Sequence, residues 1–167
     1  PLGTGLLYIR PGIEVRIDSL RQGGTGSHSE LDVQPRTLPD KYEPGSHNTP
    51  GIVALSEALA WLIERRVESL REHEIELNAR MLSGLQSIEG YSLLGPSVPA
   101  SAPDRIGLFT IVHESVDSHT LATILEDEFG ILTRAGLHCA PRAHIAAGTR
   151  DSGGLRMSFS VFTTVED

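Results

Sequence analysis

The feature that most constrains this chain is a long helical pattern in its middle. Hydrophobic side chains recur every three or four residues over 55–88, and charged side chains take the other face. Thr49 is a typical N-cap, Pro50 suits the first helical position, and Gly90 ends the pattern. About 38 helical residues would extend roughly 57 Å, more than the width of a small domain. The pattern therefore predicts a helix that joins two lobes; a core helix interrupted near residues 72–74 is the alternative.

Before this helix the chain is short of regular patterns. Residues 6–9 are apolar and bounded by turn-forming glycine and proline, which predicts a short strand, and residues 13–20 alternate loosely enough for a second one. Residues 31–48 are polar and punctuated by proline, so no long helix or strand is expected there.

After the helix, short strands alternate with short helices. The predicted elements are strands at 91–94, 106–112, 131–133 and 155–162 and a helix that starts at Asp117 and ends at Gly130. This order predicts an α/β lobe, a small α+β domain of three or four strands packed with helices.

Composition excludes several classes of protein. The 167 residues carry 14 basic and 22 acidic side chains, a net charge of −8, so no nucleic-acid partner is expected. No apolar run approaches the ~20 residues of a membrane span, and the first residues lack the pattern of a signal peptide. A single cysteine excludes an internal disulfide and suits a reducing compartment, so we expect a soluble cytoplasmic protein. The missing initial methionine and the absence of a closing helix lead us to expect a piece of something longer.

That single cysteine, Cys139, lies in the stretch 134–144, which holds the parts of a reactive thiol. Its neighbours are the imidazole of His138 and the guanidinium groups of Arg134 and Arg142, on a backbone that contains glycine and proline. Cysteine reacts as the thiolate, which nearby cations favour. The competing interpretation is a buried cysteine that acts as a small hydrophobic residue.

Two further interpretations of this stretch are weaker. His138, Cys139 and His144 could bind a metal, but zinc needs three or four ligands at suitable spacing, and we expect no metal. A cysteine hydrolase would need a base and an orienting partner, and His138 is poorly placed as that base because it adjoins the cysteine in sequence.

A glycine-rich segment, 23–27, reads Gly-Gly-Thr-Gly-Ser. Successive glycines let backbone N–H groups converge into an anion-binding nest, here around Gly24 and Thr25. The segment lacks the spacing of a nucleotide or dinucleotide loop, and a flexible surface loop is an equal alternative.

Five motifs occur together and in order: Pro-Leu-Gly-Thr-Gly at 1–5, Gly-Gly-Thr-Gly-Ser at 23–27, Glu-Pro-Gly-Ser-His-Asn-Thr-Pro-Gly-Ile at 43–52, Arg-Ala-Gly-Leu-His-Cys-Ala-Pro at 134–141 and Leu-Arg-Met-Ser-Phe at 155–159. Over essentially its whole length the chain resembles class V aminotransferases of the cysteine desulfurase type. The resemblance implies a pyridoxal 5'-phosphate enzyme of fold type I, active as a homodimer with its site between subunits.

The resemblance also implies roles for residues that would meet the substrate. Cys139 matches the thiol that takes sulfur from L-cysteine, leaving alanine and an enzyme persulfide that a sulfur-acceptor protein could receive. Arg156 matches the arginine that holds the substrate carboxylate, a task suited to a planar two-pronged donor. Arg134 would assist it, and Asn48 would lie close by.

Other residues match the cofactor's surroundings. Gly45 and Ser46 occupy the place of a Gly-Thr pair that reaches the cofactor phosphate of the other subunit, and serine keeps the hydroxyl. Gly24 and Thr25 would lie beside the same phosphate.

One departure outweighs these matches. The family's Schiff-base lysine lies just upstream of the first motif, and Lys41, the sole lysine here, is not at that position. The chain thus resembles the C-terminal part of the enzyme: the tail of the cofactor domain at 1–48, a connecting helix at 49–89 and the small domain at 90–167. It is expected to be inactive by itself. The alternatives are a non-catalytic binding or dimerisation module, or an aminotransferase or selenocysteine lyase of the same fold.

Overall fold

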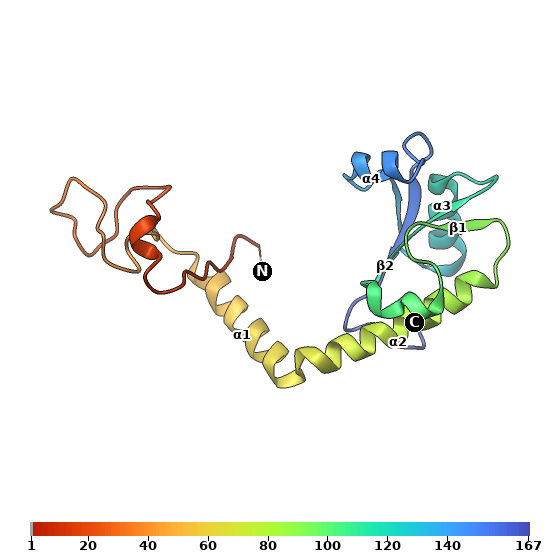
Figure 1. Ribbon diagram of the computed structural model, residues 1–167, viewed down its shortest axis with the longest axis horizontal. Coiled ribbons are helices and arrows are strands. Elements are labelled where there is room, and N and C mark those ends of the chain that lie inside the picture. Colours follow the sequence, from red (N-terminus) through yellow and green to blue (C-terminus); the bar gives the residue numbers. More distant parts are fainter. Residues whose placement is uncertain (1) are drawn as a thin grey trace. The chain divides into compact units, whose positions relative to one another are not determined.

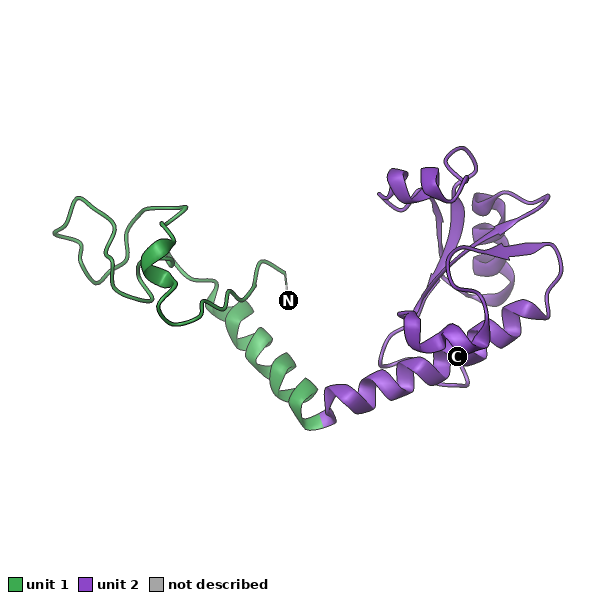
Figure 2. Ribbon diagram, in the orientation of Figure 1, with its two compact units in different colours: residues 1–64 green, residues 65–167 purple. Residues whose placement is uncertain are grey.

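The computed structural model describes residues 2–167, and Pro1, the first residue of the first motif, lies outside the described residues. The chain divides into two compact units, of which the first ends at Glu64 and the second spans Arg65–Asp167 (Figure 2). Among the described residues, no helix has both the length and the apolar character that crossing a bilayer requires.

The first unit consists mainly of loops, with a 3₁₀ turn, η1 (Glu14–Arg16), and a helix, α1 (Thr49–Arg65) (Figure 1). The predicted strands at 6–9 and 13–20 are wrong: the first segment has no regular structure, and the second contains η1. A strand needs a partner for its backbone groups, and the described part of this unit contains none. Loops are joined instead by side chains, as where the Tyr42 hydroxyl donates to the carbonyl oxygens of Glu14 at 2.9 Å and Ile17 at 3.0 Å.

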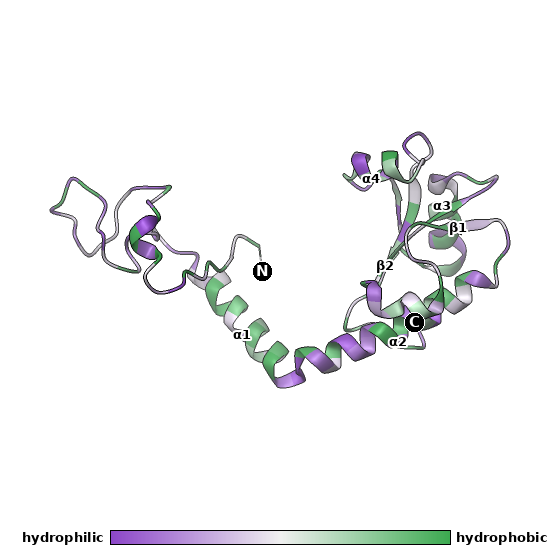
Figure 3. Ribbon diagram, in the orientation of Figure 1, coloured by the Kyte–Doolittle hydropathy of each residue, from purple (hydrophilic) through white to green (hydrophobic). Residues whose placement is uncertain are grey.

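The long helical pattern forms two helices, α1 and α2 (Val67–Gln86). Arg66 separates them with a φ of 65°. A left-handed residue cannot continue the right-handed i to i+4 hydrogen bonding, so the prediction of one uninterrupted helix is wrong at this residue. The alternative break at 72–74 is wrong as well, since these residues lie within α2. Figure 3 shows α1 mostly in the hydrophobic colour, whereas α2 alternates.

The second unit is built on a four-stranded antiparallel sheet in the order β1-β2-β4-β3. The strands are β1 (Tyr91–Leu93), β2 (Leu108–His113), β3 (Arg134–Gly136) and β4 (Gly154–Ser158), and the helices between them are η2 (Pro99–Asp104), α3 (Ser118–Phe129) and α4 (Pro141–Ala146). Because β4 is antiparallel to both β2 and β3, the segment β2-α3-β3 is a split β-α-β unit.

This architecture confirms the predicted fold class, a small mixed domain with helices on a short sheet. The first two strands lie within two residues of their predicted bounds, and the other two differ more. The third strand begins at Arg134, three residues later than expected, and the fourth ends at Ser158, where the expected alternation continued to residue 162. Helix α3 starts and ends as predicted: the Asp117 carboxylate accepts from two backbone N–H groups, and Gly130 closes the helix with a φ of 68°.

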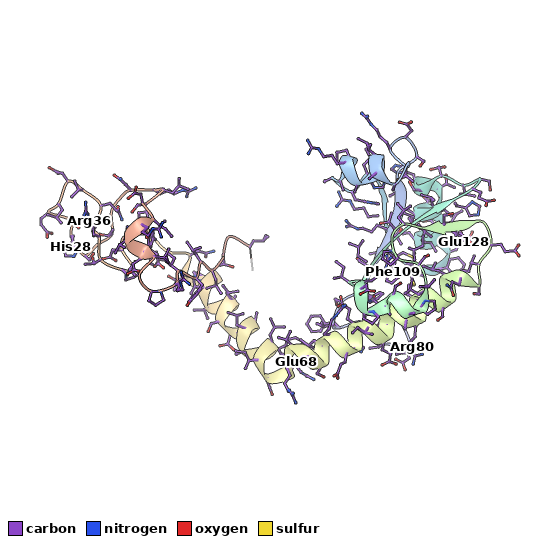
Figure 4. The ribbon with its side chains drawn as sticks, viewed as in Figure 1. His28, Arg36, Glu68, Arg80, Phe109 and Glu128 are labelled. Atoms are coloured by element: carbon purple, nitrogen blue, oxygen red, sulfur yellow. The ribbon has the colours of Figure 1, made fainter. Side chains whose placement is uncertain are left out.

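The core of the second unit lies between the sheet and its helices. One cluster of buried side chains, Leu82, Ala102 and Phe109, joins α2, η2 and β2; another, Ile111, Leu121 and Leu155, joins α3 to the sheet. Figure 4 shows Phe109 where the sheet meets α2, with Arg80 pointing away from it. These clusters form the platform behind β3 and β4, from which the reactive stretch extends.

Candidate functional site

The stretch that carries the cysteine leaves β3 through a tight turn. The Ala140 N–H donates to the Leu137 carbonyl oxygen at 2.8 Å, and the two central residues, His138 and Cys139, have φ values of 55° and 59°. Positive φ at both central positions is the pattern of a type I′ turn, where glycine and asparagine are usual. Residues with a Cβ adopt this conformation less readily than glycine, so surrounding contacts must hold the turn.

Cys139 is exposed at the tip of this turn. The interpretation of a buried hydrophobic cysteine is therefore wrong. Its Sγ lies 3.6 Å from Nη2 of Arg134. The thiol therefore has a cationic neighbour and access to solvent, which are the surroundings typical of reactive cysteines.

Arg134 and Arg156 form a pair of adjacent cations. They are register partners on β3 and β4, and Thr110 of β2 is the partner of Arg156 on its other side. Directly opposed residues of an antiparallel pair project from the same face of the sheet, where like charges repel. Within residues 2–167, neither arginine forms an ion pair with an acidic side chain. The two guanidinium groups are thus suited to share an anion.

A pocket of about 420 Å³ lies beside Arg156. Arg156, Thr110, His138 and His144 contribute to its wall, together with the buried Arg105. Arg105 serves the fold, since Nη2 donates to the Leu108 carbonyl oxygen at 3.0 Å, and burial lowers the pKa of its guanidinium. The pocket has room for a small amino acid beside the thiol turn.

The His138 ring contacts a backbone carbonyl and a second histidine. Its Nε2 lies 2.9 Å from the Arg134 carbonyl oxygen and its Nδ1 lies 3.4 Å from Nε2 of His144. Desolvation lowers the pKa of His138, and the charges of Arg156, His144 and Arg134 lower it further, against the raising effect of the Arg134 carbonyl. In the described residues no hydrogen bond joins the His138 ring to Cys139, so the cysteine-hydrolase interpretation has no base in contact with the thiol.

The residues expected at the cofactor phosphate lie in the first unit. The Gly45 N–H donates to the Gly24 carbonyl oxygen at 2.6 Å, which brings the two predicted segments together. Thr25 accepts from the Ser27 hydroxyl at 3.3 Å, and that hydroxyl also contacts the Asp40 carboxylate. Ser46 is exposed. The two loops do meet, but part of their donor capacity is used internally.

Asn48 caps α1. Its Oδ1 accepts from the Gly51 N–H at 3.2 Å, and its carbonyl oxygen accepts from the Ile52 N–H at 2.9 Å. The predicted cap at Thr49 is therefore wrong by one residue. A Cβ on Gly51 would collide with the Asn48 side chain, so a larger residue there would displace the capping amide.

Pyridoxal phosphate, the cofactor that the resemblance implies, needs a lysine amine for covalent attachment. The Nζ of Lys41 donates to the Glu14 carbonyl oxygen at 2.6 Å and lies 5.1 Å from the centroid of the Tyr42 ring. This engagement within the first unit does not fit an amine that forms a Schiff base. The residues described here therefore do not fit covalent retention of the cofactor. In the same residues, no group of three or more His, Cys, Asp or Glu side chains is arranged to hold a metal.

Sequence reasoning missed part of the site. It did not single out Thr149, Thr110 or Arg105, which the fold brings to the turn or the pocket, and it considered His144 only as a metal ligand. His144 is 4% exposed, and its Nδ1 lies 2.8 Å from the Thr149 hydroxyl oxygen. The sequence signal that could have indicated this contact is the spacing of His138 and His144, which are six residues apart with a proline between them.

Comparison with known proteins gives consistent matches. The Aminotransferase class-V family model matches residues 1–167. A probable cysteine desulfurase of Methanothermobacter thermautotrophicus is 26% identical over the whole chain, and another of Xylella fastidiosa is 32% identical over 84% of the chain. The chain covers 41% and 33% of these relatives, so it spans about two fifths of their length or less.

Solved structures of cysteine desulfurases share the fold. The apo structure of the cysteine desulfurase from Thermococcus onnurineus NA1 aligns with a TM-score of 0.78 at 24% identity, covering 95% of this chain and 38% of that one. The cysteine desulfurase CsdA from Escherichia coli, in its S-sulfonic acid form, aligns with a TM-score of 0.63 at 26% identity, covering 77% of this chain and 30% of that one.

Proposed function

Because this chain belongs to the Aminotransferase class-V family, we propose that it is the C-terminal portion of a pyridoxal-phosphate-dependent cysteine desulfurase. In this proposal Cys139 is the thiol that accepts sulfur from L-cysteine. The observation that carries it is the exposed sulfur of Cys139 held 3.6 Å from the Arg134 guanidinium. The names of the relatives, probable cysteine desulfurases, support the same reaction.

The pair of arginines supports an amino-acid substrate. Arg156 and Arg134 are register partners on one face of the sheet, and neither has an acidic partner among the described residues. A carboxylate between them would relieve their repulsion and accept two-pronged hydrogen bonds. The Thr110 hydroxyl, one strand further, is available to the same ligand. We assign the carboxylate to Arg156, with Arg134 dividing its hydrogen bonds between substrate and thiol.

The chain's own residues supply one half of the chemistry. The Cys139 thiolate forms a sulfur–sulfur bond to the substrate while the substrate's carbon–sulfur bond breaks, and the electron pair of that bond stays with carbon. Pyridoxal phosphate supplies the electron sink when it is bound. Because Lys41 is engaged with Glu14 and Tyr42, we propose that the isolated chain does not catalyse this reaction.

The test uses the full-length protein that contains this chain, with Cys139→Ser. The expected result is loss of persulfide formation and of alanine production from L-cysteine, while the spectrum of the bound cofactor is unchanged. Unchanged desulfuration would refute the assignment. Release of a keto acid in place of alanine would indicate transamination, and preference for selenocysteine would indicate a lyase of the same fold.

Arginine variants separate substrate binding from thiol chemistry. Arg156→Lys is expected to raise the KM for L-cysteine about tenfold or more, because a two-pronged donor becomes a point charge. Arg80→Lys is the matched control, since Arg80 is an exposed arginine of α2 that pairs with Glu76 and does not line the pocket. An equal effect of both substitutions would contradict the role of Arg156.

The remaining expectations concern the whole protein. By similarity to cysteine desulfurases, we propose a cytoplasmic homodimer in which Gly45 and Ser46, with Gly24 and Thr25, line the phosphate site, and a separate protein that receives the persulfide sulfur. The contact between Gly24 and Gly45 supports a shared role for their loops.

A further inference from the structure

Behind the thiol turn lies a row of polar groups that the sulfur chemistry does not use. The row starts at the Thr149 hydroxyl, which lies 2.8 Å from Nδ1 of His144. Nε2 of His144 lies 3.4 Å from Nδ1 of His138, and Nε2 of His138 lies 2.9 Å from the Arg134 carbonyl oxygen, where the row ends. His144 and Thr149 are buried, with 4% and 8% of their surface exposed. Buried polar groups of this kind are expected to be fully paired.

The carbonyl at the end of the row fixes the position of every proton in it. A carbonyl oxygen only accepts, so Nε2 of His138 carries its proton and the Nδ1 of the neutral ring accepts. Nε2 of His144 must then donate to that Nδ1, which leaves its own Nδ1 as an acceptor. The Thr149 hydroxyl is the remaining donor. All hydrogen bonds therefore run in one direction, from Thr149 to the Arg134 carbonyl.

This direction matters because both ends of Arg134 meet the turn. Its carbonyl accepts from His138, while its guanidinium contacts the sulfur of Cys139. His138 and Cys139 are also the two residues held at positive φ, a conformation that bulky residues leave unless the surroundings hold them. The row of hydrogen bonds thus restrains the backbone of the turn and the residue, Arg134, whose guanidinium lies beside the thiol.

We propose that His138 and His144 are positioning residues for Cys139, and that the one-way chain of hydrogen bonds from Thr149 holds the turn that presents the thiol to Arg134. The inference rests on the proposed function only in naming Cys139 as the reacting group. The charged and titratable groups that face His138 are Arg134 from β3, Arg156 from β4 and His144 from α4. The cations favour the neutral ring on which the direction depends.

The test compares Thr149→Val with Thr149→Ser in the full-length protein. Valine has nearly the shape of threonine but removes the donor, whereas serine keeps it. The readout is the pH profile of Cys139 alkylation by iodoacetamide, followed by peptide mass spectrometry. In Thr149→Val the rate at pH 7 is expected to fall about threefold, because the turn no longer holds the sulfur beside the Arg134 guanidinium. Thr149→Ser is expected to stay within about a factor of two of wild type, since its hydroxyl still donates.

A second variant keeps the proposal testable if Thr149→Val does not fold. His138→Asn removes the row's central ring, while asparagine tolerates positive φ, and it is expected to move the alkylation profile in the same direction. Nitrogen NMR of labelled histidines checks the direction itself: both rings should carry the proton on Nε2. A His138 ring protonated on Nδ1 in the neutral form would overturn the proposal, as would an alkylation profile that neither variant moves.

The outcomes distinguish this inference from the proposed function. Should Cys139→Ser retain desulfuration while Thr149→Val still moves the alkylation profile, the positioning role stands and the sulfur-accepting role fails. Should Cys139→Ser abolish desulfuration while the profile does not move, the reverse holds.

Discussion

The two units of this chain hold their functional residues in different ways. In the second unit, Arg134 and Arg156 are fixed by the register of a sheet whose supporting side chains, such as Leu82 and Phe109, are fully buried. In the first unit, Gly24, Thr25, Gly45 and Ser46 lie on loops joined by individual hydrogen bonds, and large apolar residues such as Leu2 and Leu20 are 98% exposed. A site on a sheet is defined by packing, whereas a site on loops depends on a few polar contacts.

This difference explains where sequence patterns failed. The apolar run at residues 6–9 has the composition of a strand, yet Leu6, Leu7 and Tyr8 are 76–83% exposed, since the described part of the first unit offers no edge to pair with. The composition of a segment shows that it could form a buried strand, but the strand forms only where the fold provides a neighbouring strand to pair with.

Hydrogen exchange provides the largest expected contrast. Backbone amides at the centre of β2 and β4 are expected to exchange about 10⁴-fold more slowly than those of loops 23–47, because a packed sheet opens only with its unit and loops open locally. Exchange followed by mass spectrometry on the intact chain measures both regions together. Similar protection of the two regions would remove the distinction between them.

Matched truncations of one buried and one exposed side chain come next. Phe109→Ala is expected to lower the free energy of unfolding by about 3–5 kcal/mol, because it opens a cavity in the cluster with Leu82 and Ala102. Leu6→Ala, at a residue 78% exposed, should change it by less than about 0.5 kcal/mol. Chemical denaturation followed by circular dichroism measures both, and a comparable loss for Leu6→Ala would mean that the first unit has a core of its own.

Removing a helix cap is expected to have a smaller effect on stability, local in the first unit and global in the second. Asn48→Ala removes the acceptor for the Gly51 N–H and is expected to cost about 1 kcal/mol in α1, with Asn48→Ser as the control that keeps a cap. Exchange at the first turn of α1 should rise while the melting of the second unit is unchanged. Asp117→Ala, at the cap of α3, should instead lower the melting temperature of the second unit, because α3 belongs to its core. A global effect of Asn48→Ala would contradict this division.

Much of the second unit could be predicted from its sequence because its signals are local. Alternation marked β4, Asp117 and Gly130 marked the ends of α3, and Arg134 and Arg156 were singled out as residues before the fold placed them opposite each other. The break at Arg66 could not be foreseen, since two arginines followed by valine carry no helix-ending signal. The contacts of His144 with Thr149 and His138 depend on backbone conformations that periodicity does not record, and the predicted roles of the site residues stay predictions.

The pH dependence of stability is the smallest expected effect. Burial and neighbouring arginines lower the pKa of His138 in the folded protein below its unfolded value of about 6.5. As pH falls below that value, the unfolded chain takes up the proton first, so stability is complete above pH ~6.5 and decreases as pH falls through the folded pKa. The loss should be roughly a few tenths of a kcal/mol, because solvent screens the half-buried ring. Chemical denaturation of wild type and His138→Asn at pH 7.5, 6.5 and 5.5 isolates this contribution, because the other titrating groups are common to both proteins. The stability of wild type relative to His138→Asn should fall toward low pH. A relative stability that rises would place the charged ring in the folded turn, and a constant one would mean that folding does not shift the pKa of His138.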